Sequence, residues 1–148
     1  MRDFVFRAWD KYNKRMHSDF IIEGSGAWID EYKRIDDYEY GIERYKRIEK
    51  EYLMQYTGEQ TYDFESYEKL KIFEGDILKF DFDKYENGGF VSHTGVVYFT
   101  SGSFYVDCTE IEHDSEALYL LSEVCFGEHP PEIIGNIYEN SELLTSED

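Results

Sequence analysis

Histidine, cysteine and carboxylate side chains could support acid–base, nucleophilic or metal chemistry, but their spacing in this chain favours none of the three. The histidines lack the paired spacing of metal ligands, and neither cysteine has a neighbouring Lys, Arg or His to lower a thiol pKa. These residues are His17, His93, His113, His129, Cys108 and Cys125. We therefore predict no catalytic residues, no cofactor and no metal, with isolated surface histidines and with cysteines that act as small buried hydrophobic residues.

Motifs for nucleotides, calcium and serine nucleophiles are also missing from the sequence. It contains no Walker loop, no G-x-G-x-x-G and no G-x-S-x-G. The segment that begins at Asp81 resembles a calcium loop, but Tyr85, Glu86 and Ser92 stand where that loop needs an oxygen ligand, Gly and Glu. A strand end followed by an Asn-Gly-Gly turn accounts for these residues better.

Composition favours a folded acidic protein. The 148 residues include 15 Lys+Arg and 33 Asp+Glu, a net charge of −18, and 18% are aromatic, which is too many for a disordered acidic tail. Every Lys and Arg lies at or before Lys84, so the 13 acidic residues of 85–148 have no basic neighbour in that half. This negative electrostatic field disfavours direct binding to nucleic acid or to an anionic membrane.

The N-terminus lacks an apolar leader, and we expect a cytoplasmic protein.

The first 71 residues are predicted to form an N-terminal α+β part. Residues 3–9 alternate apolar and polar side chains, and a polar turn at 10–14 and an extended run up to Ile22 complete a β-hairpin. Residues 29–52 carry Ile and Tyr every three or four positions, which predicts a helix, although Gly41 lies inside it. A strand at 53–58 ends in a glycine, and a polar stretch from 59 to 71 leads to the next part.

The remaining residues, 72–148, are predicted to form a small β-barrel. Five runs of strand-like sequence are separated by turn residues, and Ser101-Gly102 predicts a tight hairpin between two of them. The runs are 75–83, 93–100, 103–108, 118–126 and 132–138. The fold class is therefore mainly β, of the α+β kind, because of the helix expected in the N-terminal part.

Four short segments, read in order, are more specific than any of them alone. They are Phe6-Arg7-Ala8-Trp9-Asp10, Leu53-Met54-Gln55-Tyr56-Thr57-Gly58, Phe73-Glu74-Gly75-Asp76-Ile77 and Ile134-Gly135-Asn136-Ile137-Tyr138-Glu139-Asn140. In this order the chain resembles the YopX family of bacteriophage and prophage proteins, from Phe6 to Leu144. It departs from the family at 59–72, which is longer and more acidic and aromatic, so the local structure there stays open.

The resemblance implies a C-terminal β-barrel of the Src-homology type and a phage or prophage origin, but no catalytic residues. It singles out twelve candidate residues for interaction or structure. These are Arg7, Trp9, Asp10, Gln55, Tyr56, Gly58, Glu74, Gly75, Asp76, Gly135, Asn136 and Tyr138. The three glycines also fit turns or bulges, and the three large aromatic residues also fit core positions.

Two hypotheses for function follow from the sequence. The first is a non-enzymatic accessory protein that binds an unidentified protein partner or associates with itself, through aromatic grooves or strand edges, in a bacterium carrying the phage or prophage. The alternative is an acidic mimic of DNA that inhibits a host nucleic-acid enzyme, suggested by the carboxylates of residues 85–148. Acidic residues that only keep the protein in solution explain the same charge.

Overall fold

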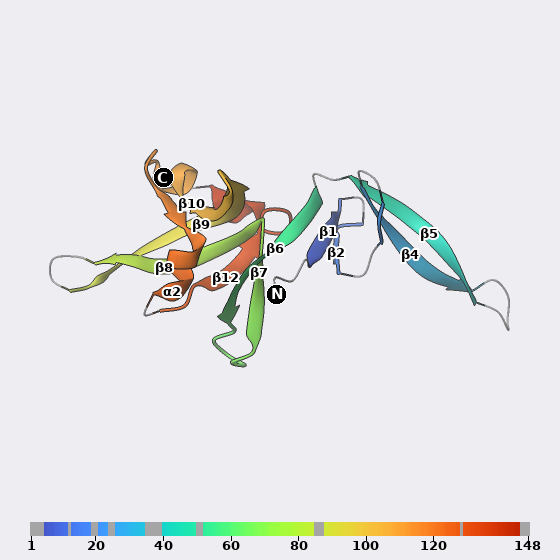
Figure 1. Cartoon of the computed structure of the whole chain (residues 1–148), viewed down its shortest axis with the longest axis horizontal. Coiled ribbons are helices and arrows are strands. Elements are labelled where there is room, and N and C mark those ends of the chain that lie inside the picture. Colours follow the sequence, from blue (N-terminus) through green and yellow to red (C-terminus); the bar gives the residue numbers. More distant parts are fainter. Residues whose placement is uncertain are drawn as a thin grey trace. The chain divides into compact units, whose positions relative to one another are not determined.

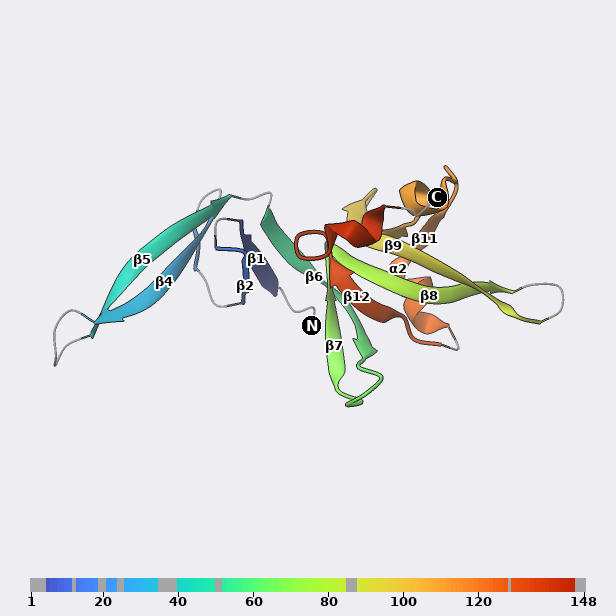
Figure 2. The same ribbon diagram turned by 180° about the vertical axis from the view of Figure 1, so that it is seen from behind.

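The protein is mainly antiparallel β-structure, as shown by a computed structural model (Figures 1 and 2). The described residues form two compact units, one before Tyr56 and one from Tyr56 onward. The structure describes residues 5–11, 13–18, 21–23, 26–34, 40–49, 52–84, 88–127 and 129–145.

The first unit begins with the predicted β-hairpin. Strand β1 (Phe6–Asp10) pairs with β2 (Arg15–His17), and the Asp10 carboxylate closes the turn by accepting hydrogen bonds from the backbone N–H of Asn13 at 3.3 Å and from its Nδ2 at 2.8 Å. This is the local bonding through which Asp stabilises turns. On its other side, β1 pairs with the start of β6 (Leu53–Tyr62). The hairpin prediction is confirmed for residues 6–9 and 15–17. Ile21 and Ile22, expected to continue its second strand, belong instead to β3 (Ile21–Glu23), which pairs with another strand, and residues 3, 4, 12, 19 and 20 lie outside the described residues.

The helix predicted over 29–52 is wrong. Strands β3 (Ile21–Glu23), β4 (Gly26–Arg34) and β5 (Tyr40–Glu49) form an antiparallel sheet in that order. The segment 29–52 is rich in Tyr and Ile, which favour strands, and a glycine inside a helix is unfavourable. The ladder skips one residue of β5, Tyr45, between Ile29 and Asp30 of β4, which is a β-bulge. Residues 35–39 and 50–51 of the predicted helix lie outside the described residues.

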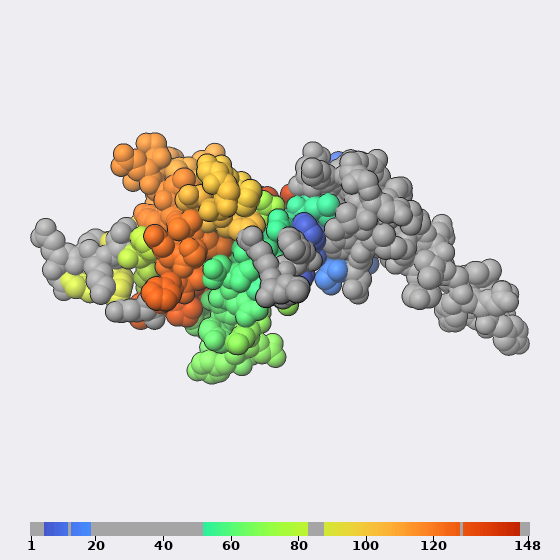
Figure 3. All heavy atoms as spheres, viewed as in Figure 1, coloured from blue at the N-terminus to red at the C-terminus, as the bar shows by residue number. Residues whose placement is uncertain are grey.

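The second unit begins with a hairpin where the sequence predicts a polar connection. Strand β6 continues to Tyr62 and returns as β7 (Lys69–Phe73). Two extra residues of β6 bulge from the ladder between Tyr56 and Gln60, and Gly58 takes a positive φ of 87° there. In the space-filling view this hairpin protrudes from the unit, at the green part of the colour bar (Figure 3). The segment that departs from the family pattern is therefore ordered as a β-hairpin.

A five-stranded antiparallel sheet completes the second unit, in the order β11-β10-β9-β8-β12. It curls into about half of a barrel. Its strands are β8 (Asp76–Lys84), β9 (Phe90–Thr100), β10 (Ser103–Asp107), β11 (Leu118–Leu120) and β12 (Glu132–Asn136). The predicted hairpin at Ser101-Gly102 is confirmed by the pairing of β9 with β10.

The strand predicted over 118–126 is confirmed only as far as Leu120. Helix α2 (Leu121–Phe126) follows, and it buries Leu121 and Val124 while Ser122 and Glu123 are exposed. A spacing of three between buried residues is that of a helix lying on a sheet, and an apolar run this short is ambiguous in sequence. Helix α1 (Thr109–Glu112) links β10 to β11, and a 3₁₀ turn, η2 (Ser141–Leu144), follows β12.

The core of the second unit lies between the curled sheet and α2. Its most buried members come from β7, β8, β9, β10 and α2, with Cys108 and Ala117 from the flanks of α1. They are Ile72, Leu78, Phe80, Val97, Phe104, Val106, Cys108, Ala117, Leu121 and Val124. The domain boundary expected between residues 71 and 72 falls inside β7, whose Ile72 belongs to this core.

Within the described ranges, no helix has the length and apolar character needed to cross a membrane.

Candidate functional site

The feature of the second unit best suited to binding is a pair of shallow hollows that meet at Phe64 and Glu132, which we call the Phe64 groove. One hollow, of about 250 Å³, lies between Phe64, strand β8 and the segment before β12. The other, of about 290 Å³, lies between the tip of the β6–β7 hairpin and the start of β12. The two are lined by Tyr62, Asp63, Phe64, Glu65, Leu70, Lys79, Phe80, Asp81, Ser92, His129, Pro130, Glu132 and Ile133.

The tip of the hairpin is built so that it exposes aromatic side chains. Asp63 accepts hydrogen bonds at its Oδ1 from the backbone N–H of Glu65 at 2.8 Å and of Ser66 at 3.1 Å. These donors, Ser66 first, hold the pKa of the Asp63 carboxyl below its ordinary value, so it stays ionised at neutral pH. The ordered turn leaves Phe64 50% exposed and Tyr67 81% exposed. Exposed aromatic residues on an ordered turn are typical of a contact surface.

The walls of the groove are predominantly acidic. Four carboxylates line it, from Asp63, Glu65, Asp81 and Glu132, against one lysine, Lys79. Aromatic and aliphatic groups between them provide apolar surface. The groove therefore offers apolar contact and negative charge together, which suits part of a protein chain better than a small anion.

Two of the predicted motif segments are brought together by the pairing of β8 with β12, in which Asn136 lies opposite Asp76. Gly75 has a φ of 89°, donates its N–H to the Val97 carbonyl at 2.8 Å and accepts at its carbonyl from the Ile137 N–H at 2.9 Å. Asp76, only 1% exposed, accepts a hydrogen bond from the backbone N–H of Phe73 at 2.8 Å. Glu74 lies in the same turn and is partly buried.

The second of these segments is a tight turn organised by Asn136. Its Oδ1 accepts hydrogen bonds from the backbone N–H of Tyr138 at 3.0 Å and of Glu139 at 2.9 Å. Its Nδ2 donates to the Glu139 carboxylate at 3.1 Å. A Cβ placed on Gly135 would lie 2.5 Å from Oδ1 of Asn140, so a larger residue does not fit. The side-chain amide of Asn136 is thus hydrogen-bonded within its own turn. This motif therefore fixes the path of the backbone rather than presenting polar groups to a ligand.

The other candidate residues are divided between the two units. Trp9 is 7% exposed and Asp10 is 1% exposed in the first unit, where Arg7 lies opposite Met54 and Gln55 lies opposite Phe6. These positions are those of core and ladder residues.

In the second unit, Tyr56 is 5% exposed, with its ring centroid 5.8 Å from that of Phe73. Gly58 is at the bulge and Tyr138 is partly buried. The structure therefore brings the candidates of 74–76 and 135–138 together, and it places Tyr56 and Gly58 on β6 instead.

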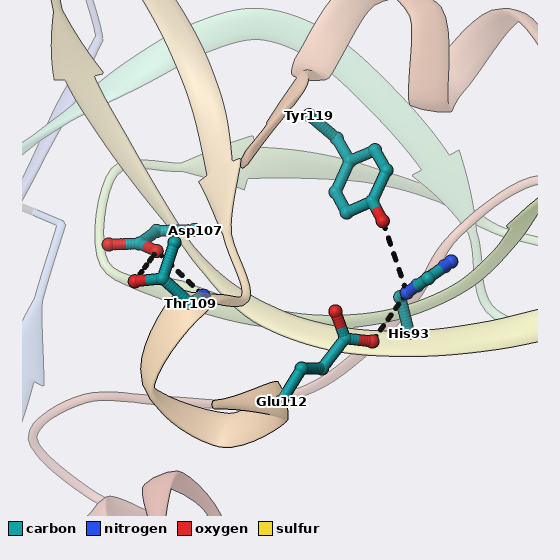
Figure 4. A network of polar contacts seen from close by, with 5 residues as sticks. All are labelled: His93, Asp107, Thr109, Glu112 and Tyr119. Carbon is teal, nitrogen blue, oxygen red and sulfur yellow. Dashed lines mark hydrogen bonds and ion pairs between the residues drawn. The ribbon is translucent and has the colours of Figure 1, made fainter. Parts of the chain in front are cut away.

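His93 is not the surface histidine expected from the sequence, because its side chain is buried within the second unit (Figure 4). Its Nδ1 contacts the Glu112 carboxylate, and the Tyr119 hydroxyl lies 3.4 Å from the same nitrogen. Asp107 accepts hydrogen bonds from the Thr109 N–H at 2.9 Å and hydroxyl at 2.6 Å, at the start of α1, which carries Glu112. The network therefore ties α1 to β9.

A His–carboxylate pair is an arrangement that can orient a general base for a nearby nucleophile. The thiol just before α1 belongs to Cys108, and burial, then Glu112 and Asp107, raise its pKa to about 12. Burial also raises the pKa of Cys125 to about 12. A protonated, buried thiol is a poor nucleophile, so neither cysteine is suited to nucleophilic attack. No group of three metal-ligating side chains occurs in the part of the chain that the structure describes.

Sequence reasoning missed the Phe64 groove because it treated 59–71 as a connection. The signal was present as Tyr62-Asp63-Phe64-Glu65-Ser66-Tyr67. Aromatic residues alternate there with turn-forming ones, and an Asp with a Ser three positions later is a local turn pattern.

Comparison with known proteins gives a family and a fold. A family model described as YopX protein matches residues 5–145. A search of curated proteins gave no match. The crystal structure of protein EF1440 from Enterococcus faecalis is similar, with 22% sequence identity and a TM-score of 0.50, over 98% of this chain and 100% of that one. At this identity the likeness bears on the fold alone.

Proposed function

The chain belongs to the YopX family, and we propose that it is a non-enzymatic accessory protein that binds a segment of another protein in the Phe64 groove. The observation that carries the proposal is the ordered hairpin tip, which holds Phe64 half-exposed where two hollows meet. A phage or prophage origin, and action in the cytoplasm of the bacterium that carries it, belong to the same proposal. Fractionation of such a bacterium tests the location.

The groove suits an extended peptide because its two hollows follow one another along the start of β12. They share Phe64 and Glu132, so a bound segment could place successive side chains on either side of the Phe64 ring. An exposed aromatic residue at the centre of a contact, surrounded by polar groups, is the usual arrangement of a protein interface hot spot.

A finer proposal concerns the fold: the curled sheet of the second unit is a small barrel of the Src-homology type. A curled antiparallel sheet of five strands, with a tight turn between β9 and β10, supports it. Barrels of this kind bind peptides in aromatic-lined grooves. For peptide binding by this chain, that is an argument from analogy of fold only. An experimental structure that showed an open sandwich in place of a closing barrel would contradict it.

The proposed function is tested by selection from an mRNA-displayed library of random dodecapeptides on the immobilised full-length chain. We expect recovered peptides to bind the unsubstituted chain and to lose at least tenfold in affinity on Phe64→Ser. The matched control is Phe126→Ser, since Phe126 is 92% exposed and does not line the groove. Recovery of no peptide, or of peptides that bind Phe64→Ser as well as the control, would contradict the proposal.

A second candidate, the DNA mimic, is supported by the carboxylates around α1. Asp107, Glu110, Glu112, Asp114 and Glu116 lie within ten residues of sequence. Binding of this kind weakens steeply as salt rises, and duplex DNA competes with it. Capture of a bacterial DNA-handling enzyme that resists both high salt and excess duplex DNA would exclude the mimic.

A further inference from the structure

We propose that the segment bound in the Phe64 groove is cationic, with an arginine or lysine side chain held between Asp81 and Glu132 and with apolar neighbours packed against Phe64. This inference rests on the proposed function and adds the chemistry of the partner. It is carried by the placement and the unused charge of these two carboxylates.

Asp81 and Glu132 line the same hollow from two paired strands. Glu132 lies opposite Lys79 in the ladder between β12 and β8, and Asp81 is two residues further along β8. Residues two apart on a strand point to the same face of the sheet, so Asp81 and Lys79 share a face. Both carboxylates are exposed at the mouth of the hollow that Phe64 closes.

Neither carboxylate is bound by another side chain. In the part of the chain that the structure describes, the side chains of Asp81 and Glu132 make no hydrogen bond or ion pair, and Lys79, which lies opposite Glu132, forms an ion pair with neither. A cationic ligand would therefore find two carboxylates with free acceptor oxygens. Guanidinium groups bind carboxylates through paired hydrogen bonds, which adds direction to the attraction.

The apolar part of the groove matches the rest of a basic side chain. Phe64 and Pro130 line the hollow beside the two carboxylates, while Phe80, which also borders it, is buried in the core. Arginine and lysine bury their aliphatic stems on apolar surface, and their charged ends are attracted to aromatic faces. An acidic or purely apolar segment would use only part of this surface.

The overall charge acts in the same direction over a longer range. Residues 85–148 hold 13 acidic residues and no basic one, and they supply β9, β10, β11 and β12 of this unit. Such a field raises the association rate of a cationic segment at low salt. It repels an acidic segment.

The test uses the dodecapeptides recovered from the mRNA-displayed library. We expect them to be enriched in Arg and Lys relative to the input, and we expect replacement of each Arg by citrulline, its neutral isostere, to weaken binding at least tenfold. Asp81→Asn and Glu132→Gln should each weaken the Arg peptide and leave the citrulline peptide unchanged. Glu123→Gln, an exposed carboxylate of α2 outside the groove, is the matched control.

The outcomes separate this inference from the proposed function. Recovered peptides that are neutral or acidic, or that bind equally well with citrulline, would overturn the cationic partner while the groove remains a binding site, provided that Phe64→Ser still abolishes binding. Recovery of no peptide would overturn both.

Discussion

Gly135→Ala is the sharpest test of the conclusion that the 134–140 motif is architectural. An added Cβ would lie 2.5 Å from Oδ1, 2.6 Å from Cγ and 2.8 Å from Cβ of Asn140. These distances are well inside van der Waals contact, so the Asn140 side chain must move. It cannot move without weakening the hydrogen bond that its Oδ1 accepts from the backbone N–H of Asn136 at 3.2 Å.

The expected destabilisation has two parts. Forcing a methyl group into a filled site costs about 1–3 kcal/mol. Losing one hydrogen bond in the turn costs about 0.5–1.5 kcal/mol more. We therefore expect Gly135→Ala to lower the free energy of unfolding of the second unit by about 1.5–4.5 kcal/mol.

The assay is urea unfolding followed by NMR signals of β8 and β12, so that the second unit is observed separately from the first. Gly127→Ala is the control, because a Cβ there meets only the Val124 carbonyl oxygen at an ordinary 3.6 Å. Truncation of the obstacle in Gly135→Ala/Asn140→Ala should return the stability close to that of Asn140→Ala alone. Strictly additive effects, or a loss under about 0.5 kcal/mol for Gly135→Ala, would refute the steric explanation.

Three further predictions concern the interior of the second unit. Gly95→Ala should destabilise it by about 3 kcal/mol in the same urea assay, because the new Cβ would lie 2.6 Å from the Asp107 carbonyl oxygen, and backbone cannot yield as a side chain does. Thr61→Val should cost about 1–3 kcal/mol, since the buried Thr61 hydroxyl donates to the Pro131 carbonyl, which would lose its donor; an unchanged urea midpoint would contradict this. The Cys108 pKa of about 12 lies above its ordinary 9.0, so the neutral thiol stabilises the fold below pH 9 and this contribution falls as pH rises from about 9 to about 12. Cys108→Ala should therefore lose less stability than the unsubstituted chain between pH 8 and pH 11, and equal losses would contradict the shifted pKa.

Much of the strand pattern could be predicted because local signals and tertiary structure agree there. At the first hairpin, the alternation before Asp10 and the turn chemistry of Asp10 and Asn13 point to the same structure, and the structure confirms it. At Ser101-Gly102, a short turn between two apolar runs left little choice, and Gly102 has the positive φ of 79° that the turn needs.

The errors occurred where one spacing fits two structures. In the segment 29–52, Tyr and Ile recur at three or four positions, as in a helix, but both residue types also favour strands. In 118–126, an apolar run changes from strand to helix at Leu121 without a capping residue to mark the change. Periodicity over so few residues cannot separate these cases, because the choice is made by packing on the rest of the sheet.

The candidate residues come from a family pattern, and this pattern indicates mainly where the backbone needs a special conformation. In this chain Gly58 and Gly75 adopt positive φ and Asn136 bonds to its own turn, so these residues set the path of the backbone. The groove lies instead in the segment that departs from the pattern. A binding surface that differs between relatives leaves no such mark on a single sequence.

The pairing of β12 with β8 also bears on the order in which the second unit folds. Only a few residues of sequence separate β8 from β9 and β9 from β10, whereas β12 is separated from β8 by the whole β9–β10–α1–β11–α2 segment. Closing a long loop costs more chain entropy than closing a short one, so the meander is expected to form first and β12 to add last. A strand that adds last can also detach first during unfolding, because the meander forms without it. The Asn136 turn that anchors β12 would then control how long the folded unit survives more than how fast it forms.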